Sequence, residues 1–185
     1  SSDLAEVRYN YKIGHNQHLV GRMMAGAIYS YGNARISPYN EQFYIGGANS
    51  LRAFTIRSIG PGRYHPEENN TYNYLDQTGD LKFEANLEYR FPILGDLHGA
   101  AFIDTGNIWL IRNDDQRPGG QLKWGRFLKD LALDAGVGLR YDLTFIVIRL
   151  DMGIPLHVPY ETDKNGYFNV PKYTPGWHLA IGYPF

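Results

Sequence analysis

The chain has 185 residues, and its 18 Lys and Arg against 19 Asp and Glu give a formal net charge of −1. This balance gives no basis for bulk attraction to nucleic acid, and the lack of cysteine excludes disulfides, thiolate metal sites and cysteine nucleophiles. No run of about 18 apolar residues suits a transmembrane helix, whereas 15% aromatic residues with 21 Gly and 10 Pro predict a β-rich fold.

Apolar and polar residues alternate along most of the chain, which is typical of strands with one apolar and one polar face. The clearest case runs from Leu81 to Phe91, where every odd position is apolar or aromatic and every even position is polar. In chain order, the alternating segments cover residues 5–13, 18–32, 81–91, 97–110, 131–141, 146–154 and 177–185. The sequence therefore predicts about seven strands, with weaker patterns at 18–32 and 97–110.

The connections between these strands alternate between short and long. Short ones fall near residues 14–17, 94–96 and 142–143, and long polar ones cover about 33–79, 111–128 and 157–174. Outer-membrane barrels have this asymmetry, with short periplasmic turns and long extracellular loops. A soluble β-sandwich or a lipocalin-like barrel would show the same alternation. The loop asymmetry, the aromatic residues near strand ends and the aromatic last segment favour the membrane barrel.

Five motifs then appear in a fixed order. The loop segment 46–54 contains Leu51-Arg52-Ala53-Phe54, and it is followed by an aromatic-x-Asp-x-Gly segment at 102–106 and a Gly-x-Gly-x-Arg segment at 136–140. The segments 149–156 and 176–185 complete the series. Together they resemble the outer-membrane assembly-factor superfamily of BamA/TamA-type barrels (bacterial surface antigen family). The family usually has Gly where this chain has Ala53.

The resemblance implies an all-β fold, in which residues 1–185 form the C-terminal part of a transmembrane outer-membrane β-barrel. The loop at about 33–79 is expected to be a lid inside the barrel lumen, with Arg52 against Asp104. Because these family barrels have about sixteen strands, we expect the first barrel strands and the periplasmic repeat domains to lie outside this chain.

The resemblance also implies three sets of site residues. The lid-loop motif is Leu51, Arg52, Ala53 and Phe54. The lumenal partners of the lid are Phe102, Asp104, Gly106, Gly136, Gly138 and Arg140. The C-terminal insertion signal is Trp177, Leu179, Ile181, Tyr183 and Phe185, all expected on the outward face.

Motifs for catalysis and ligand binding are weak. The six histidines show no paired ligand spacing, so no metal is expected, and segment 136–138 lacks the rest of a dinucleotide fingerprint, so no cofactor is expected. The adjacent carboxylates at 67–68 and 114–115 are interpreted as solvated loop charge. No feature of the sequence requires an enzyme.

Two functions follow from the resemblance. The leading one is an outer-membrane protein assembly or insertion factor of the translocation and assembly module type, which acts through a lateral seam between the first and last strands. The alternative is a two-partner secretion pore or a passive outer-membrane channel. The expected location is the outer membrane of a Gram-negative bacterium. The expected partners are outer-membrane lipids, unfolded outer-membrane proteins and accessory assembly proteins, with no nucleic acid.

Overall fold

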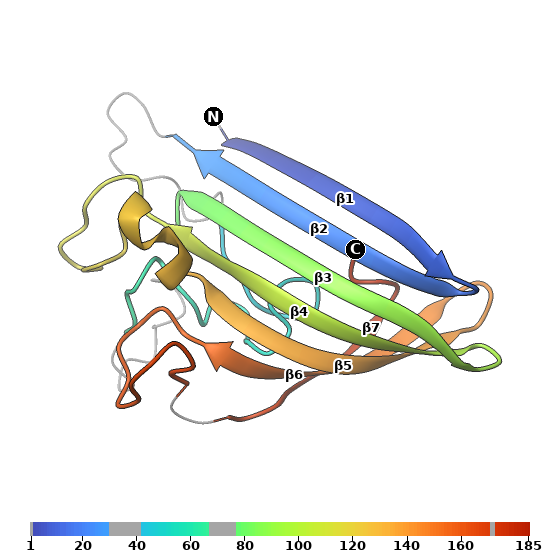
Figure 1. Ribbon diagram of the computed structural model, residues 1–185. Coiled ribbons are helices and arrows are strands. Elements are labelled where there is room, and N and C mark those ends of the chain that lie inside the picture. Colours follow the sequence, from blue (N-terminus) through green and yellow to red (C-terminus); the bar gives the residue numbers. More distant parts are fainter. Residues whose placement is uncertain (1, 30–41, 67–76, 171–172) are drawn as a thin grey trace.

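The computed structural model describes residues 2–29, 42–66, 77–170 and 173–185 (Figure 1). Seven strands form one antiparallel sheet, in which each strand pairs with the next in the sequence. The strands are β1 (Ser2–Gly14), β2 (Gln17–Ile28), β3 (Leu81–Leu94), β4 (Leu97–Trp109), β5 (Ala132–Asp142), β6 (Val147–His157) and β7 (Gly176–Ile181). One 3-10 helix, η1 (Trp124–Lys129), lies between β4 and β5. The predicted all-β fold with about seven strands is confirmed.

Two strands end four residues before their predicted ends. β2 ends at Ile28, and residues 30–32 of its predicted segment lie outside the described residues. β7 ends at Ile181 and does not continue to residue 185. The reason is local, because Gly182 has a φ of +84°, which turns the chain out of the extended conformation.

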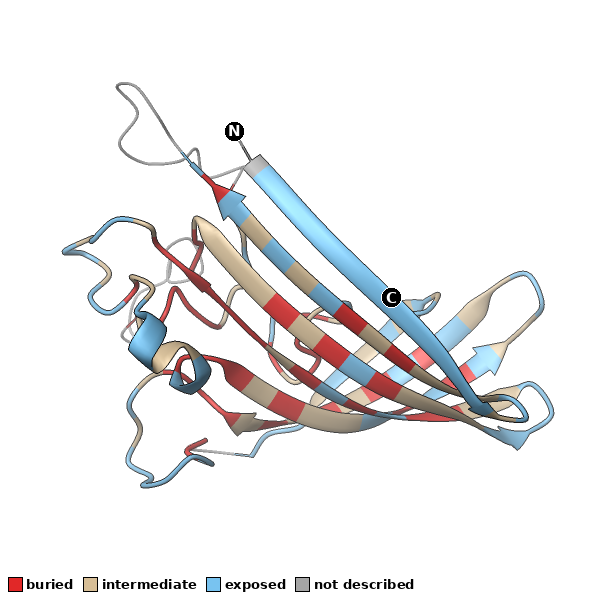
Figure 2. Cartoon of the chain, turned by 45° about the horizontal axis from the view of Figure 1, so that its top comes forward, coloured by how far each residue is buried: buried red, intermediate tan, exposed pale blue. Residues whose placement is uncertain are grey.

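The distribution of polar and apolar residues across the sheet is the reverse of that in a soluble protein. The charged side chains of Glu84, Glu88 and Asp104 are buried on the concave face, whereas Val137 and Leu179 on the other face are 53% and 76% exposed. Figure 2 shows this alternation along β3 as bands of buried residues separated by intermediate or exposed ones. Within the described residues, no helix is long and apolar enough to span a membrane.

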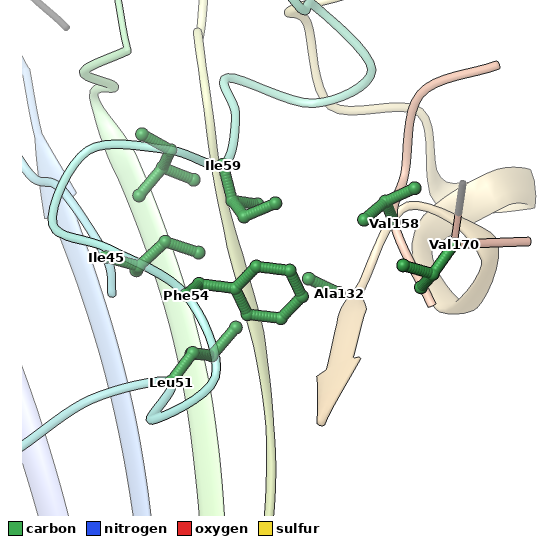
Figure 3. Packing of buried hydrophobic residues seen from close by; sticks show 8 residues of the cluster. Ile45, Leu51, Phe54, Ile59, Ala132, Val158 and Val170 are labelled. Carbon is green, nitrogen blue, oxygen red and sulfur yellow. The ribbon is translucent and has the colours of Figure 1, made fainter. Parts of the chain in front are cut away.

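The concave face is occupied by the described part of the long loop after β2, residues 42–66. This loop and the ends of the strands form a small apolar core, consisting of Ile45, Leu51, Phe54, Ile59, Ile108, Ala132, Val158 and Val170. In Figure 3 the ring of Phe54 points away from the loop toward Ala132, the first residue of β5. The predicted lid loop of 33–79 is therefore seen only in part, since 33–41 and 67–76 lie outside the described residues.

Candidate functional site

The tip of the loop is a compact turn that presents Arg52 to the sheet. Gly46 and Gly47 have φ values of +100° and +93°, which residues other than glycine rarely adopt. The amide of Gly47 donates to the carbonyl of Phe54 at 2.8 Å, and the amide of Phe54 donates to the carbonyl of Leu51 at 3.1 Å. These bonds close the turn, so that the motif residues 51–54 project together from one rigid loop.

Arg52 is fully buried and bound to β3 and β4. Its Nε donates to Asp104 Oδ2 at 2.7 Å, and its Nη2 donates to Asp104 Oδ1 at 2.9 Å. Its Nη1 pairs with Glu88, and its guanidinium lies 3.5 Å from the ring centroid of Phe102. Burial alone would lower the pKa of Arg52, but the carboxylates of Asp104 and Glu88 outweigh it and raise that pKa above its ordinary value. Arg52 thus remains charged, held by a bidentate ion pair and a cation–π contact.

Ala53 is also held by the sheet. Its amide donates to Asp134 Oδ2 on β5 at 3.1 Å. Ala53 does not have a positive φ, so the alanine fits a position where the family usually has glycine. The lid tip therefore bridges β4 and β5, because the side chain of Arg52 binds one strand and the backbone of Ala53 binds the next.

The surrounding charges continue from the arginine across the sheet. Arg140 on β5 donates to Glu88 at 3.0 Å and to Asp151 Oδ1 on β6 at 2.5 Å. Arg149 donates to the same Asp151 at 2.8 Å and to the carbonyl of Ala48 in the lid at 2.9 Å. Each of these guanidinium groups is 1% exposed or less, so the charges compensate one another in a buried network.

A second anchor joins the loop to β2 and β3. Arg22 donates to the carbonyl of Asn49 at 2.8 Å and to Asn86 at 3.0 Å, and it pairs with Glu84. The hydroxyl of Ser50 donates to the other oxygen of Glu84 at 2.8 Å. The lid therefore contacts polar side chains on all five strands from β2 to β6.

Glycines make room for this close approach. A methyl group on Gly153 would lie 2.8 Å from the amide nitrogen of Ala53, and one on Gly176 would lie 3.1 Å from the carbonyl oxygens of Arg52 and Ala53. A methyl group on Gly106 would lie 3.3 Å from Leu51. The backbone of the lid thus packs directly against the backbone of β6 and β7.

The C-terminal residues depart from the expected outward series. Trp177, Leu179 and Ile181 are exposed on the outward face as predicted. Tyr183 and Phe185 are not on that face, because the chain turns at Gly182 toward the concave side. The guanidinium of Arg90 lies 4.4 Å from the ring centroid of Tyr183, and Arg90 donates to the carbonyl of Phe185 at 3.2 Å. The outward placement of these two aromatics was therefore wrong.

The structure thus brings the lid motif together with the predicted partners. Of these partners, Phe102 and Asp104 contact Arg52 directly, Gly106 underlies Leu51, and Arg140 shares Glu88 with Arg52. Gly136 leaves room for the ring of Phe102, and Gly138 leaves room for the side chains of Arg140 and Asp151.

The prediction did not include the lid contacts of Arg22, Glu88, Arg149, Gly153 and Gly176. Their only signal was their position on the polar face of a strand. Among the residues that the structure describes, there is no group of three or more His, Asp or Glu that could hold a metal ion.

Exposed apolar side chains on the outside and a buried network of charges on the concave side define a segment of a membrane β-barrel with an arginine-anchored internal loop. The model of the Omp85 superfamily domain matches residues 2–185, and the chain belongs to this superfamily. The outer membrane protein assembly factor BamA of Nitratidesulfovibrio vulgaris is 29% identical over 155 residues, which are 83% of this chain and 17% of that protein. These matches place the chain in the outer membrane of a Gram-negative bacterium.

One solved structure shows the same fold, and a second was also matched. The crystal structure of BamA from Haemophilus ducreyi lacking POTRA domains 1-3 superposes with a TM-score of 0.60 at 16% identity, over 98% of this chain and 34% of that one. CdiB from Acinetobacter baumannii gives a TM-score of 0.43 at 15% identity, over 96% of this chain and 32% of that one. The chain therefore spans about a third or less of the length of the relatives that it matches.

Proposed function

We propose that this chain is the part of an outer-membrane protein assembly factor that carries the lid and the last barrel strand. In this role, which needs no catalysis, the whole protein helps β-barrel proteins to enter the outer membrane. The family and the similarity to BamA support a role in assembly or secretion. The choice of insertion through a lateral seam depends on the last strand.

The observation that carries this proposal is the shortness of β7. Six residue pairs join it to β6, compared with ten between β5 and β6. The chain leaves the sheet directly after Ile181. A short edge strand exposes unpaired backbone donors and acceptors, which an incoming strand can pair with by β-augmentation. A seam made with this strand would be the weakest joint of the closed barrel.

The lid supports the same choice over an open channel. Residues 42–66 occupy the concave face and are held by buried ion pairs, so transport through the lumen would first require these contacts to break. A two-partner secretion pore or a passive channel requires that opening. An assembly factor that acts at the seam works with the lid in place.

The test uses the full-length protein in its own membrane. A photo-crosslinking amino acid at Leu179 on β7, which is exposed on the outward face like Leu139, should capture a newly made outer-membrane protein that is stalled during insertion. The matched position is Leu139 in the middle of the sheet, where β5 pairs on both sides and no capture is expected. Equal capture at the two positions, or no capture together with ion conductance through the reconstituted protein, would favour the pore.

A further inference from the structure

The helix η1 packs on the outward face of the sheet, on the side opposite to the lid. The ring of Phe127 lies 5.3 Å from the ring of Trp109 on β4 and 5.3 Å from the ring of Phe83 on β3. Phe83 shares its face with the exposed Leu87, so this cluster belongs to the apolar exterior. Figure 1 shows η1 at the end of β4, which is the end of the sheet with the long connections. In a barrel of this kind that end lies outside the cell.

The 3-10 geometry divides the side chains of this segment into separate edges. With three residues per turn, residues i and i+3 lie on the same side, so Arg126 and Lys129 form one basic edge. Trp124 lies on the aromatic edge beside Phe127, at a ring distance of 6.1 Å. Trp124 is nevertheless 81% exposed, although it continues an aromatic cluster that packs on the membrane-facing side. Leu128 is similarly 72% exposed.

A groove of about 580 Å³ lies beside the basic edge, between η1 and the loop that follows β6. Its basic lining residues are Arg63, Arg126, Lys129 and Lys164. Glu161, the only acidic residue among the lining residues described, pairs with Arg63 at 2.6 Å. Arg126 lies 3.6 Å from a carboxylate oxygen of Asp130, and the ammonium of Lys164 lies 4.5 Å from the ring centroid of Tyr173. The groove therefore has an excess of positive charge.

We propose that η1 and this groove form a binding surface for an anionic lipid of the outer leaflet. Trp124 and Leu128 enter the boundary between headgroups and acyl chains, and Lys129 and Lys164 bind the phosphate of the headgroup. The occupant follows from two observations. The aromatic edge is continuous with the lipid-facing side of β3 and β4, and the neighbouring groove has the charge that complements a phosphate. Tryptophan and basic side chains combine in this way at membrane interfaces.

The apolar part of the surface is tested by quenching in lipid nanodiscs that contain the full-length protein. The readout is the fluorescence lost on replacing Trp124 with phenylalanine, which isolates the emission of this side chain. Brominated phosphatidylcholine should quench the emission of Trp124, and brominated phosphatidylglycerol should quench it more strongly. If neither lipid quenches it, the proposal fails. A disulfide between two copies of a Leu128→Cys variant would then identify a second copy as the occupant.

The basic part is tested by charge removal in the same assay. Replacing Lys129 and Lys164 with glutamine should reduce the preference for the brominated phosphatidylglycerol about twofold or more. The matched control is Lys12→Gln, which removes the same charge from the polar face of β1 at the opposite end of the sheet. A preference that persists in the double variant, or that falls equally in the control, overturns the assignment of the groove to a phosphate headgroup.

Discussion

Replacing Arg52 with alanine is expected to release the lid tip from the sheet while the strands stay paired. The side chain is completely buried and makes two hydrogen bonds to Asp104 as well as an ion pair with Glu88. Removing one member of a buried pair costs about 3–5 kcal/mol, because the remaining charge stays buried without its partner. Since about 1.4 kcal/mol is a factor of ten, the population with a released lid should rise roughly a hundredfold to several thousandfold.

The assay follows a single thiol on the lid. The chain has no cysteine, and Leu51 is fully buried next to Arg52, so a Leu51→Cys variant reports opening of the lid through its rate of reaction with a thiol reagent. Arg63→Ala is the matched control, because Arg63 belongs to the same loop but pairs with the exposed Glu161, at 2.6 Å. Its reaction rate should change little.

A double-mutant cycle then isolates the contact itself. The effects of Arg52→Ala and Asp104→Ala on the opening free energy should not add, and the coupling between them should be about 1–3 kcal/mol. Glu88 keeps Arg90 and Arg140 in either variant, but it also keeps Arg52 in the Asp104→Ala variant, so Asp104→Ala alone should cost less than Arg52→Ala. Strictly additive effects would show that the two side chains do not act on each other, and the ion pair would then not be what holds the lid.

Three further predictions concern other parts of the chain. Removing Phe185 should lower the amount of assembled barrel in membrane fractions much more than total synthesis, and unchanged assembly would contradict an insertion signal. Gly153→Ala should speed reaction at the Leu51→Cys probe roughly tenfold or more, because its methyl group meets the lid backbone, whereas Gly125→Ala meets no atom within 4 Å and should not. Burial raises the pKa of Asp130, so the folded protein binds this proton more tightly than the unfolded chain. Stability from this group is therefore present at low pH and lost as the pH rises through the raised pKa, and Asp130→Asn should flatten this part of the unfolding profile.

The alternation of residues was sufficient to predict the strands and their faces. Side chains along a strand alternate between its two faces. Because Glu84 and Glu88 in β3 lie an even number of positions apart, both charges must be on the same face. The same argument placed Asp104 in the lumen. It did not predict which lumenal acid would bind Arg52, since that depends on where a long loop comes to rest. The family resemblance supplied that choice, and the structure adds Glu88 as a second acid.

The sequence did not reveal where the last strand ends or where the short helix η1 packs. Alternation continues through Tyr183 and Phe185, but a single residue, Gly182, ends the strand and reverses their side. Similarly, η1 is a short segment whose position depends on contacts with Trp109 and Phe83, and both of these residues are far from η1 in the sequence. Pairwise packing of this kind leaves no periodic signal.

The carboxylates around the lid are shared, and this sharing determines how the lid can move. Glu88 accepts from three arginines, of which only Arg52 belongs to the loop, and Asp151 accepts from both Arg140 and Arg149. Partial withdrawal of the loop would leave some of these buried charges without a partner, so intermediate positions are unfavourable. Raising the salt concentration should therefore weaken the ion pairs between the lid and the sheet only slightly, since buried pairs are weakly screened by salt.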